Sequence, residues 1–158
     1  MSVTINTTIN GTPISANAEA STSLLEFLRD TLEMKGSKLC CNTGECGACT
    51  VIYNGKPINT CVTMAADAIG AQITTIEGLA DGDKLHPVQQ AFIDTGAVQC
   101  GYCTPGFIMS VKALLDRTTK PTPSDIEEAV SGNICRCTGY NKIVDAIHLA
   151  ADRIAGRA

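Results

Sequence analysis

Cysteine is the residue type with the most evident chemistry in this sequence. Nine cysteines occur among 158 residues. The first residues, MSVTINTTINGTPIS, have neither the basic nor the apolar region of an export signal. We therefore expect a cytoplasmic protein, unless it is exported as the cargo of a signal-bearing partner. In a reducing compartment, so many thiols are more typical of metal ligands than of disulfides.

The first group of cysteines has a spacing that is known from iron–sulfur proteins. Cys41, Cys46 and Cys49 follow the pattern C-x4-C-x2-C, and Cys61 lies further along the chain. This is the plant-type ferredoxin spacing, in which four thiolates hold one [2Fe–2S] cluster. Cys46 and Cys49 alone also suit half of a zinc site. Cys40 is one position out of register, and we expect a small buried residue; the alternatives are a substitute ligand and a redox-sensitive thiol.

A second group consists of the pairs Cys100-x2-Cys103 and Cys135-x-Cys137. Both pairs fall in predicted connections between helices, so two loops at one end of a helical bundle would bring four thiolates together. The C-x2-C spacing is also that of a zinc knuckle, and spacing alone leaves zinc open. The tighter C-x-C pair favours an iron–sulfur cluster over zinc.

The first half of the chain has the pattern of short strands. Apolar and polar residues alternate over residues 3–9, and Asn10-Gly11 predicts a hairpin turn to a second strand near residues 14–18. Another hairpin is predicted around Asn54-Gly55, and a last strand over residues 72–78.

One helix is predicted within this strand-rich half. It begins at Ser21 or Thr22, carries a stripe of leucines, and ends at Gly36. Residues 37–49, which contain most of the first cysteine group, have no periodicity and are expected to form a loop.

The second half has a helical pattern. A polar, glycine-containing linker over residues 77–85 precedes four stretches with apolar residues at helical spacing. These stretches are residues 86–96, 105–117, 123–132 and 141–156. The fold class predicted for the chain is therefore α+β.

Four strings in order resemble the small iron–sulfur subunit of the molybdenum hydroxylases, the family of xanthine dehydrogenase, aldehyde oxidoreductase and CO dehydrogenase. They are GSKLCCNTGECGACTV, TIEGL, QCGYCTPGFIMS and GNICRCTGY. The resemblance covers nearly the whole chain. It implies a β-grasp ferredoxin-like domain at residues 1–78 and a four-helix bundle at residues 79–158. Cys40 departs from the glycine that is common at this position of the family.

The resemblance also implies two [2Fe–2S] clusters. The distal cluster would be held by Cys41, Cys46, Cys49 and Cys61, and the proximal cluster by Cys100, Cys103, Cys135 and Cys137. Gln99 and Cys137 match positions that face the pterin of the molybdenum cofactor on a large partner subunit. Gln99 has a simpler interpretation too, as a polar residue that holds its loop.

The function implied is electron transfer for a molybdenum hydroxylase whose substrate chemistry takes place on another chain. Single electrons would pass from the molybdopterin centre through both clusters to FAD on a third, medium subunit or to a separate acceptor. A free-standing two-cluster electron carrier is the alternative, and a zinc-stabilised interaction module is a third hypothesis.

Other functions are disfavoured by what the sequence lacks. Its twelve Lys and Arg are spread along the chain, unlike the concentrated basic face of nucleic-acid-binding proteins. No apolar run is long enough to span a membrane. No residue is predicted to act in catalysis, since His86 and His148 have the settings of structural residues.

Overall fold

Two hairpins and one short strand form a mixed sheet in the first half of the chain. The computed structural model, which describes residues 1–157, gives the strand order β2-β1-β5-β3-β4. The bounds are β1 Ser2–Ile9, β2 Thr12–Glu19, β3 Thr50–Tyr53, β4 Lys56–Asn59 and β5 Gln72–Thr74. The central strand β5 runs parallel to β1 and antiparallel to β3.

Both hairpin turns occur where they were predicted. Asn10 and Gly11 have φ angles of 51° and 79°, and Asn54 and Gly55 have 47° and 81°. Two successive positive φ angles define the turn that matches the twist of paired strands, and Asn-Gly adopts it readily. The predicted strand over residues 72–78 is shorter than expected, because Ile76–Gly78 forms a 3₁₀ turn after β5.

The predicted helix after β2 was wrong at both ends. Ser23 caps it, through reciprocal hydrogen bonds with Glu26, and the α-helical part is only Leu24–Glu26 (α1). A π-helical turn, Phe27–Thr31, follows, in which the Leu32 N–H donates to the Phe27 carbonyl 3.1 Å away.

The segment after this π turn folds back instead of continuing as a helix. Glu33 has a φ angle of 58°, which ends the helical run. The Arg29 guanidinium donates to the carbonyls of Lys35 and Ser37, at 3.1 and 2.6 Å. Gly36, the predicted helix end, donates its N–H to the Glu77 carboxylate at 2.7 Å. Tertiary contacts therefore determine the path into the first cysteine loop.

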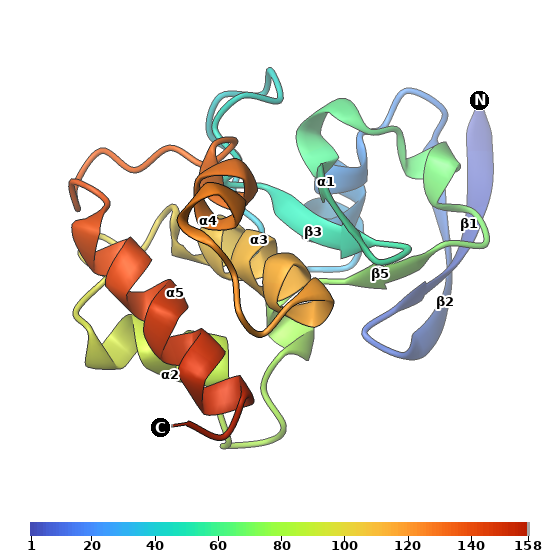
Figure 1. Ribbon diagram of the computed structural model, residues 1–158. Coiled ribbons are helices and arrows are strands. Elements are labelled where there is room, and N and C mark those ends of the chain that lie inside the picture. Colours follow the sequence, from blue (N-terminus) through green and yellow to red (C-terminus); the bar gives the residue numbers. More distant parts are fainter. Residues whose placement is uncertain (158) are drawn as a thin grey trace.

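The second half contains the four predicted helices. They are α2 Pro87–Asp94, α3 Thr104–Arg117, α4 Pro123–Val130 and α5 Asn141–Ile154. Figure 1 shows them together on one side of the molecule, with the sheet on the other. They share one apolar core, which includes Phe92, Phe107, Leu114 and Ile147.

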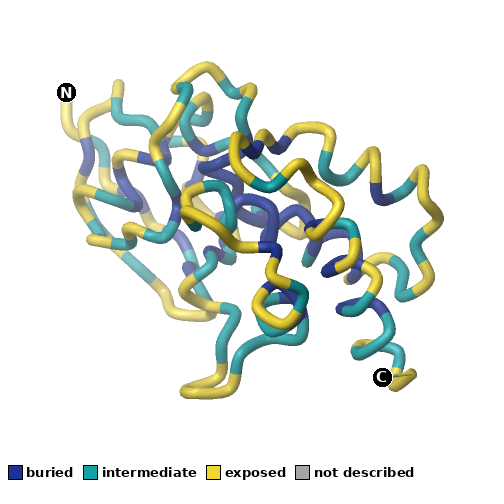
Figure 2. Tube along the Cα trace, turned by 90° about the vertical axis from the view of Figure 1, so that its left-hand side faces the viewer, coloured by how far each residue is buried: buried dark blue, intermediate teal, exposed yellow. Residues whose placement is uncertain are grey.

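Helix α3 joins the two halves. Its Met109 and Ala113 pack against Ile52 of β3, with the partly buried Ile76 and Leu79 beside them. Buried segments accordingly run through the middle of the molecule, and exposed segments form its outer loops (Figure 2). Over residues 1–157, no helix is both long and apolar enough for a membrane span.

Candidate metal centres

The first cysteine group lies in the loop before β3 and in the 3₁₀ turn Thr60–Val62, which carries Cys61. The Cys41 sulfur accepts the backbone N–H groups of Thr43 and Cys46, at 3.4 and 3.5 Å. The Thr43 hydroxyl, together with these N–H groups, lowers the pKa of the Cys41 thiol to about 5. Cys41 is therefore prepared to be a thiolate.

The other thiols of this group lie beside one another. Burial and, to a smaller extent, the neighbouring Cys49 thiol together raise the pKa of Cys61 to about 11. Burial also raises the pKa of Cys46, and the charge of Cys41 contributes. The four thiols thus form two adjacent pairs, Cys41 with Cys46 and Cys49 with Cys61.

The second group occupies the α2–α3 and α4–α5 connections. The Cys100 and Cys137 sulfurs are 3.6 Å apart. Burial and, to a smaller extent, the adjacent Cys135 thiol together raise the pKa of Cys103 to about 12. This group too consists of two pairs, Cys100 with Cys137 and Cys103 with Cys135. A cavity of about 170 Å³ lies among the four thiols.

Cys135 is the thiol of the second group that receives the most hydrogen bonds. Its sulfur accepts the Thr138 hydroxyl at 3.0 Å and the N–H groups of Thr138 and Cys137 at 3.3 and 3.4 Å. Burial acts to raise the pKa of Cys135, but these donors outweigh burial and lower it. Cys135 therefore resembles Cys41: each group has one sulfur that is surrounded by donors.

The paired arrangement indicates which metal would fit. Two thiolates on one tetrahedral metal, with bonds of about 2.3 Å, lie about 3.8 Å apart. The separation of Cys100 and Cys137 is close to this value. Within residues 1–157, no three His, Cys, Asp or Glu side chains converge on one point as a single ion requires. Two thiolate pairs suit a binuclear [2Fe–2S] cluster, which takes two thiolates on each iron.

Hydrogen bonds to backbone carbonyls connect the two cysteine loops directly. The Ile134 N–H donates to the Cys46 carbonyl at 3.0 Å, and the Asn133 side-chain amide donates to the Gly47 carbonyl at 3.1 Å. The Tyr102 hydroxyl donates to the Leu39 carbonyl. One hydrogen bond therefore joins Cys46 of the first group to the residue next to Cys135 of the second.

Cys40 differs from the expectation of a small buried residue. Its side chain is exposed, and it lines the cavity of the second group together with Cys46. The two cysteine loops contact each other, and Cys40 therefore lies at the cavity of the second group instead of being buried beneath the first cysteine loop.

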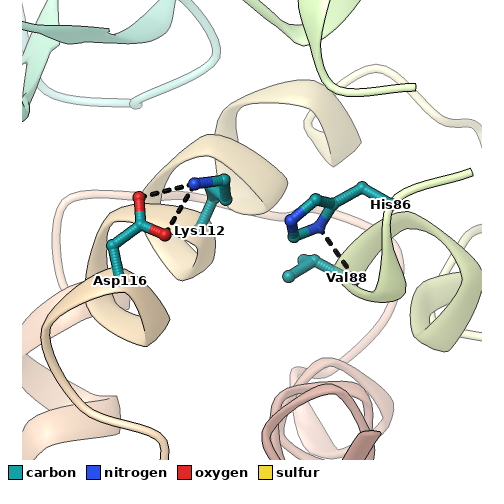
Figure 3. Close-up of polar contacts among 4 residues, drawn as sticks. All are labelled: His86, Val88, Lys112 and Asp116. Atoms are coloured by element: carbon teal, nitrogen blue, oxygen red, sulfur yellow. Dashed lines mark hydrogen bonds and ion pairs between the residues drawn. The ribbon is translucent and has the colours of Figure 1, made fainter. Parts of the chain in front are cut away.

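The remaining candidates have simple positions. Gln99 is exposed beside the exposed Cys100, and Arg136 is exposed at the rim of the second cavity. His86 caps helix α2, since its Nδ1 accepts the Val88 N–H at 3.2 Å; Lys112 and Asp116 lie on the facing helix (Figure 3). His148 is exposed on α5.

The sequence did not single out three residues that support the sites. Asn133 and Thr138 lie in the GNICRCTGY string, and their closeness to Cys135 in the sequence is the feature from which a supporting role could have been predicted. Ser110 of α3 ends the QCGYCTPGFIMS string, but spacing did not reveal its contact with Asn133, which is 23 positions away in the chain.

Comparisons with known proteins match an iron–sulfur domain to each half of the chain. A model described as "2Fe-2S iron-sulfur cluster binding domain" matches residues 7–70, and one described as "[2Fe-2S] binding domain" matches residues 75–148. The nicotinate dehydrogenase small FeS subunit of Eubacterium barkeri is 48% identical over 153 residues, which are 97% of this chain and 98% of that protein.

Solved structures are similar over the whole chain. Quinoline 2-oxidoreductase from Pseudomonas putida 86 has a chain with a TM-score of 0.92 and 38% identity, with 99% of both chains covered. Aldehyde oxidoreductase from Desulfovibrio gigas has a TM-score of 0.94 and 43% identity, but 99% of this chain covers only 18% of that one.

The fold and the two thiol groups define an iron–sulfur protein of the [2Fe–2S] class. More specifically, the chain belongs to the [2Fe–2S] iron–sulfur subunits of the molybdenum hydroxylase family. The relatives are, by name, iron–sulfur components of larger oxidoreductases, and this chain is a component of that kind.

Proposed function

We propose that the chain binds two [2Fe–2S] clusters and transfers single electrons within a molybdenum hydroxylase. One cluster would be held by Cys41, Cys46, Cys49 and Cys61, and the other by Cys100, Cys103, Cys135 and Cys137. The observation that carries this proposal is the arrangement of eight thiols as two sets of two pairs, linked by the hydrogen bond from Ile134 to Cys46.

Clusters bound at these thiols would supply one-electron redox chemistry. The chain's own residues provide the ligands, the burial and the N–H donors that stabilise negative charge on sulfur. The hydrogen bond between the Ile134 N–H and the Cys46 carbonyl gives a short covalent and hydrogen-bonded connection between the two ligand sets.

We further propose two domains with a boundary between residues 78 and 79. The first, residues 1–78, would be a β-grasp ferredoxin-like domain, which the mixed sheet with its central strand β5 supports. The second, residues 79–158, would be a four-helix bundle, supported by the shared core of α2–α5. Separate family models match residues 7–70 and 75–148, which supports two parts without marking the boundary at residue 78.

The proposed partner is a large molybdopterin-binding subunit that carries the substrate chemistry. The Desulfovibrio gigas protein, in which the matching region is a small part of one long chain, supports a large partner. Gln99 and Cys137 are exposed at the second group and are the proposed pterin-facing residues. The final acceptor would be FAD on a medium subunit or a separate carrier, and the complex would be cytoplasmic.

The test is EPR spectroscopy of the dithionite-reduced protein, with spin integration and analysis of iron and acid-labile sulfide. Two distinct S = ½ signals near two spins per chain are expected. One signal, with full metal recovery, would return Cys100, Cys103, Cys135 and Cys137 to a zinc site. Co-purification of a molybdenum-containing chain is expected as well; a chain that purifies alone with both clusters would favour the free-standing carrier.

A further inference from the structure

Strand β2 is a long and regular edge of the sheet. It has eight residues, pairs with β1 along its whole length without a bulge, and has no strand on its other side among the described residues. Figure 1 shows the β1–β2 hairpin on the opposite side of the molecule from α2 and α5. Edge strands of soluble proteins are usually protected against pairing with other chains by charged side chains, by bulges or by being short.

The hydrogen-bonding groups of β2 point alternately toward β1 and away from it, as in any antiparallel pair. Ala20 continues the ladder, since its N–H donates to the Met1 carbonyl at 3.0 Å. Residues of even number therefore bond to β1, and the N–H groups of Ser15, Asn17 and Glu19 point outward. Within residues 1–157, none of these outward N–H groups has an acceptor.

The edge also carries almost no charge that would oppose strand pairing. Glu19 is the only charged side chain among residues 1–25, and the N-terminal amino group pairs with it at 2.8 Å. The exposed side chains of Ser15 and Asn17 are neutral. Pro13, which has no N–H to donate, protects only the end of β2 beside the turn. Residues 15–19 therefore remain open to pairing with another strand.

We propose that β2 pairs antiparallel with β2 of a second copy of this chain, about a two-fold axis at Asn17. In this register the two Asn17 residues exchange hydrogen bonds, and Ser15 of each copy exchanges them with Glu19 of the other. The Glu19 carbonyl already accepts the Thr22 N–H at 2.9 Å, and its second lone pair is available to Ser15.

This register is favoured because the edge is complementary to itself. Every outward N–H of residues 15–19 gains an acceptor, and Pro13 stays outside the paired segment. Each Glu19 lies opposite a serine, so the two carboxylates do not face each other. The interface is independent of the proposed electron-transfer role, since β2 contains no cysteine.

The test is sedimentation velocity of the full chain, with iron analysis, over a series of protein concentrations. The wild type should form a dimer whose fraction rises with concentration. Asn17→Lys and Asn17→Asp each place two like charges opposite one another, so each should weaken the dimer by about fivefold. An equimolar mixture of the two variants should recover the dimer, because lysine then faces aspartate. Asn17→Asp, which hardly changes the side-chain volume, keeps the test valid where lysine impairs folding.

Thr4→Lys is the matched control. Thr4 lies opposite Asn17 on β1, and its hydroxyl donates to the Asn17 side-chain oxygen at 2.8 Å. Thr4→Lys and Asn17→Lys therefore remove the same hydrogen bond and add the same charge to the same face, but only residue 17 lies on the edge strand. Thr4→Lys should leave the dimer unchanged.

Three results would overturn the inference: a wild type that stays monomeric, an equal effect of Thr4→Lys, and no recovery in the mixture. Loss of a co-purifying subunit from the Asn17→Lys protein, with the dimer unchanged, would overturn it too, because a strand of that subunit would then occupy the edge. Failure of the proposed function is seen separately, as fewer than two [2Fe–2S] signals in the wild type.

Discussion

At the scale of single residues, the eight paired thiols are not equivalent. Cys41 and Cys135 each accept several hydrogen bonds, whereas Cys61 and Cys103 are held in environments that raise their pKa. The sequence identified the thiols by their spacing, but it did not reveal the donors. Those depend on local turns, such as the one that brings the Thr138 hydroxyl back to the Cys135 sulfur.

Thr138→Val tests the role of that hydroxyl. Valine has nearly the same shape and keeps the backbone N–H, so the change removes the bond from the hydroxyl to the Cys135 sulfur, together with the long bond of 3.4 Å that the hydroxyl accepts from the Tyr140 N–H. A loss of about 1 kcal/mol of stabilisation of the reduced form corresponds to about 40 mV for a one-electron couple. We expect the second cluster's midpoint potential to fall by this order in an EPR-monitored titration. An unchanged potential would show that the hydroxyl does not tune this cluster.

Cys40→Ala tests which of the two adjacent cysteines is the ligand. Cys40 is exposed and lies at the second cavity, so we expect its removal to leave iron, sulfide and both EPR signals at wild-type values. Cys41→Ala is the matched change one position along, and it should eliminate the first cluster's signal. Loss of a signal in Cys40→Ala would show that Cys40 serves as a ligand after all.

At the scale of elements, local sequence signals predicted the hairpins and the four long helices, because Asn-Gly turns and N-terminal prolines act within a few residues. The π turn after α1 could not be predicted in this way. It depends on Arg29 reaching Lys35 and Ser37, and on Gly36 reaching Glu77 from a distant segment. The close approach of α3 to the first cysteine loop is likewise a tertiary feature.

Gly106→Ala tests that approach. A Cβ at Gly106 would overlap the Gly47 carbonyl oxygen and would lie 3.2 Å from the Ala48 Cα, and neither backbone atom can move freely. We expect a loss of about 3 kcal/mol of stability, together with loss of the first cluster. Gly132→Ala is the control, since its Cβ would have no neighbour within 4 Å. Chemical denaturation and iron analysis measure both effects; similar stability in the two variants would contradict the packing.

Helix α2 should make the protein sensitive to mild acid. Burial, with Lys112 nearby, lowers the pKa of His86, and Asp116 opposes this in part. The neutral imidazole is the form that accepts the Val88 N–H. The stability that this cap contributes is complete above the pKa of His86 in the unfolded chain, which is about 6.5. It is lost as the pH falls from that value through the lower pKa of His86 in the folded protein, because the unfolded chain binds the proton more readily in this range.

His86→Asn provides the measurement, because asparagine caps helices well and does not titrate. Between about pH 7.5 and pH 5.5, the wild type should lose more thermal stability than this variant, by an amount approaching the roughly 1 kcal/mol that a helix cap contributes. Comparing the two proteins cancels the acid sensitivity of the clusters, which both share. Equal losses would show that His86 does not titrate in this range.

At the scale of the whole molecule, hydrogen bonds and packing hold two cysteine loops from different halves of the chain together. The bonds from Ile134 to Cys46 and from Asn133 to Gly47, with α3 packed on β3, leave little freedom between the thiol groups. The sequence predicted two separate sites and could not predict this rigid arrangement, because the contacts join residues that are far apart in the chain. For the two proposed clusters, a fixed, short separation suits rapid electron transfer without any domain movement.

A direct consequence is magnetic interaction between the two clusters. Two S = ½ centres whose ligand segments are joined by one hydrogen bond of 3.0 Å should broaden or split each other's EPR signals when both are reduced. In Cys61→Ser or Cys100→Ser proteins, the remaining signal should lose this broadening, because its magnetic neighbour is absent. The comparison is made at low temperature on fully reduced samples, with spin integration to confirm one cluster per chain. Identical line shapes with and without the second cluster would contradict the close, fixed arrangement, since rigidly held neighbouring spins cannot avoid dipolar coupling.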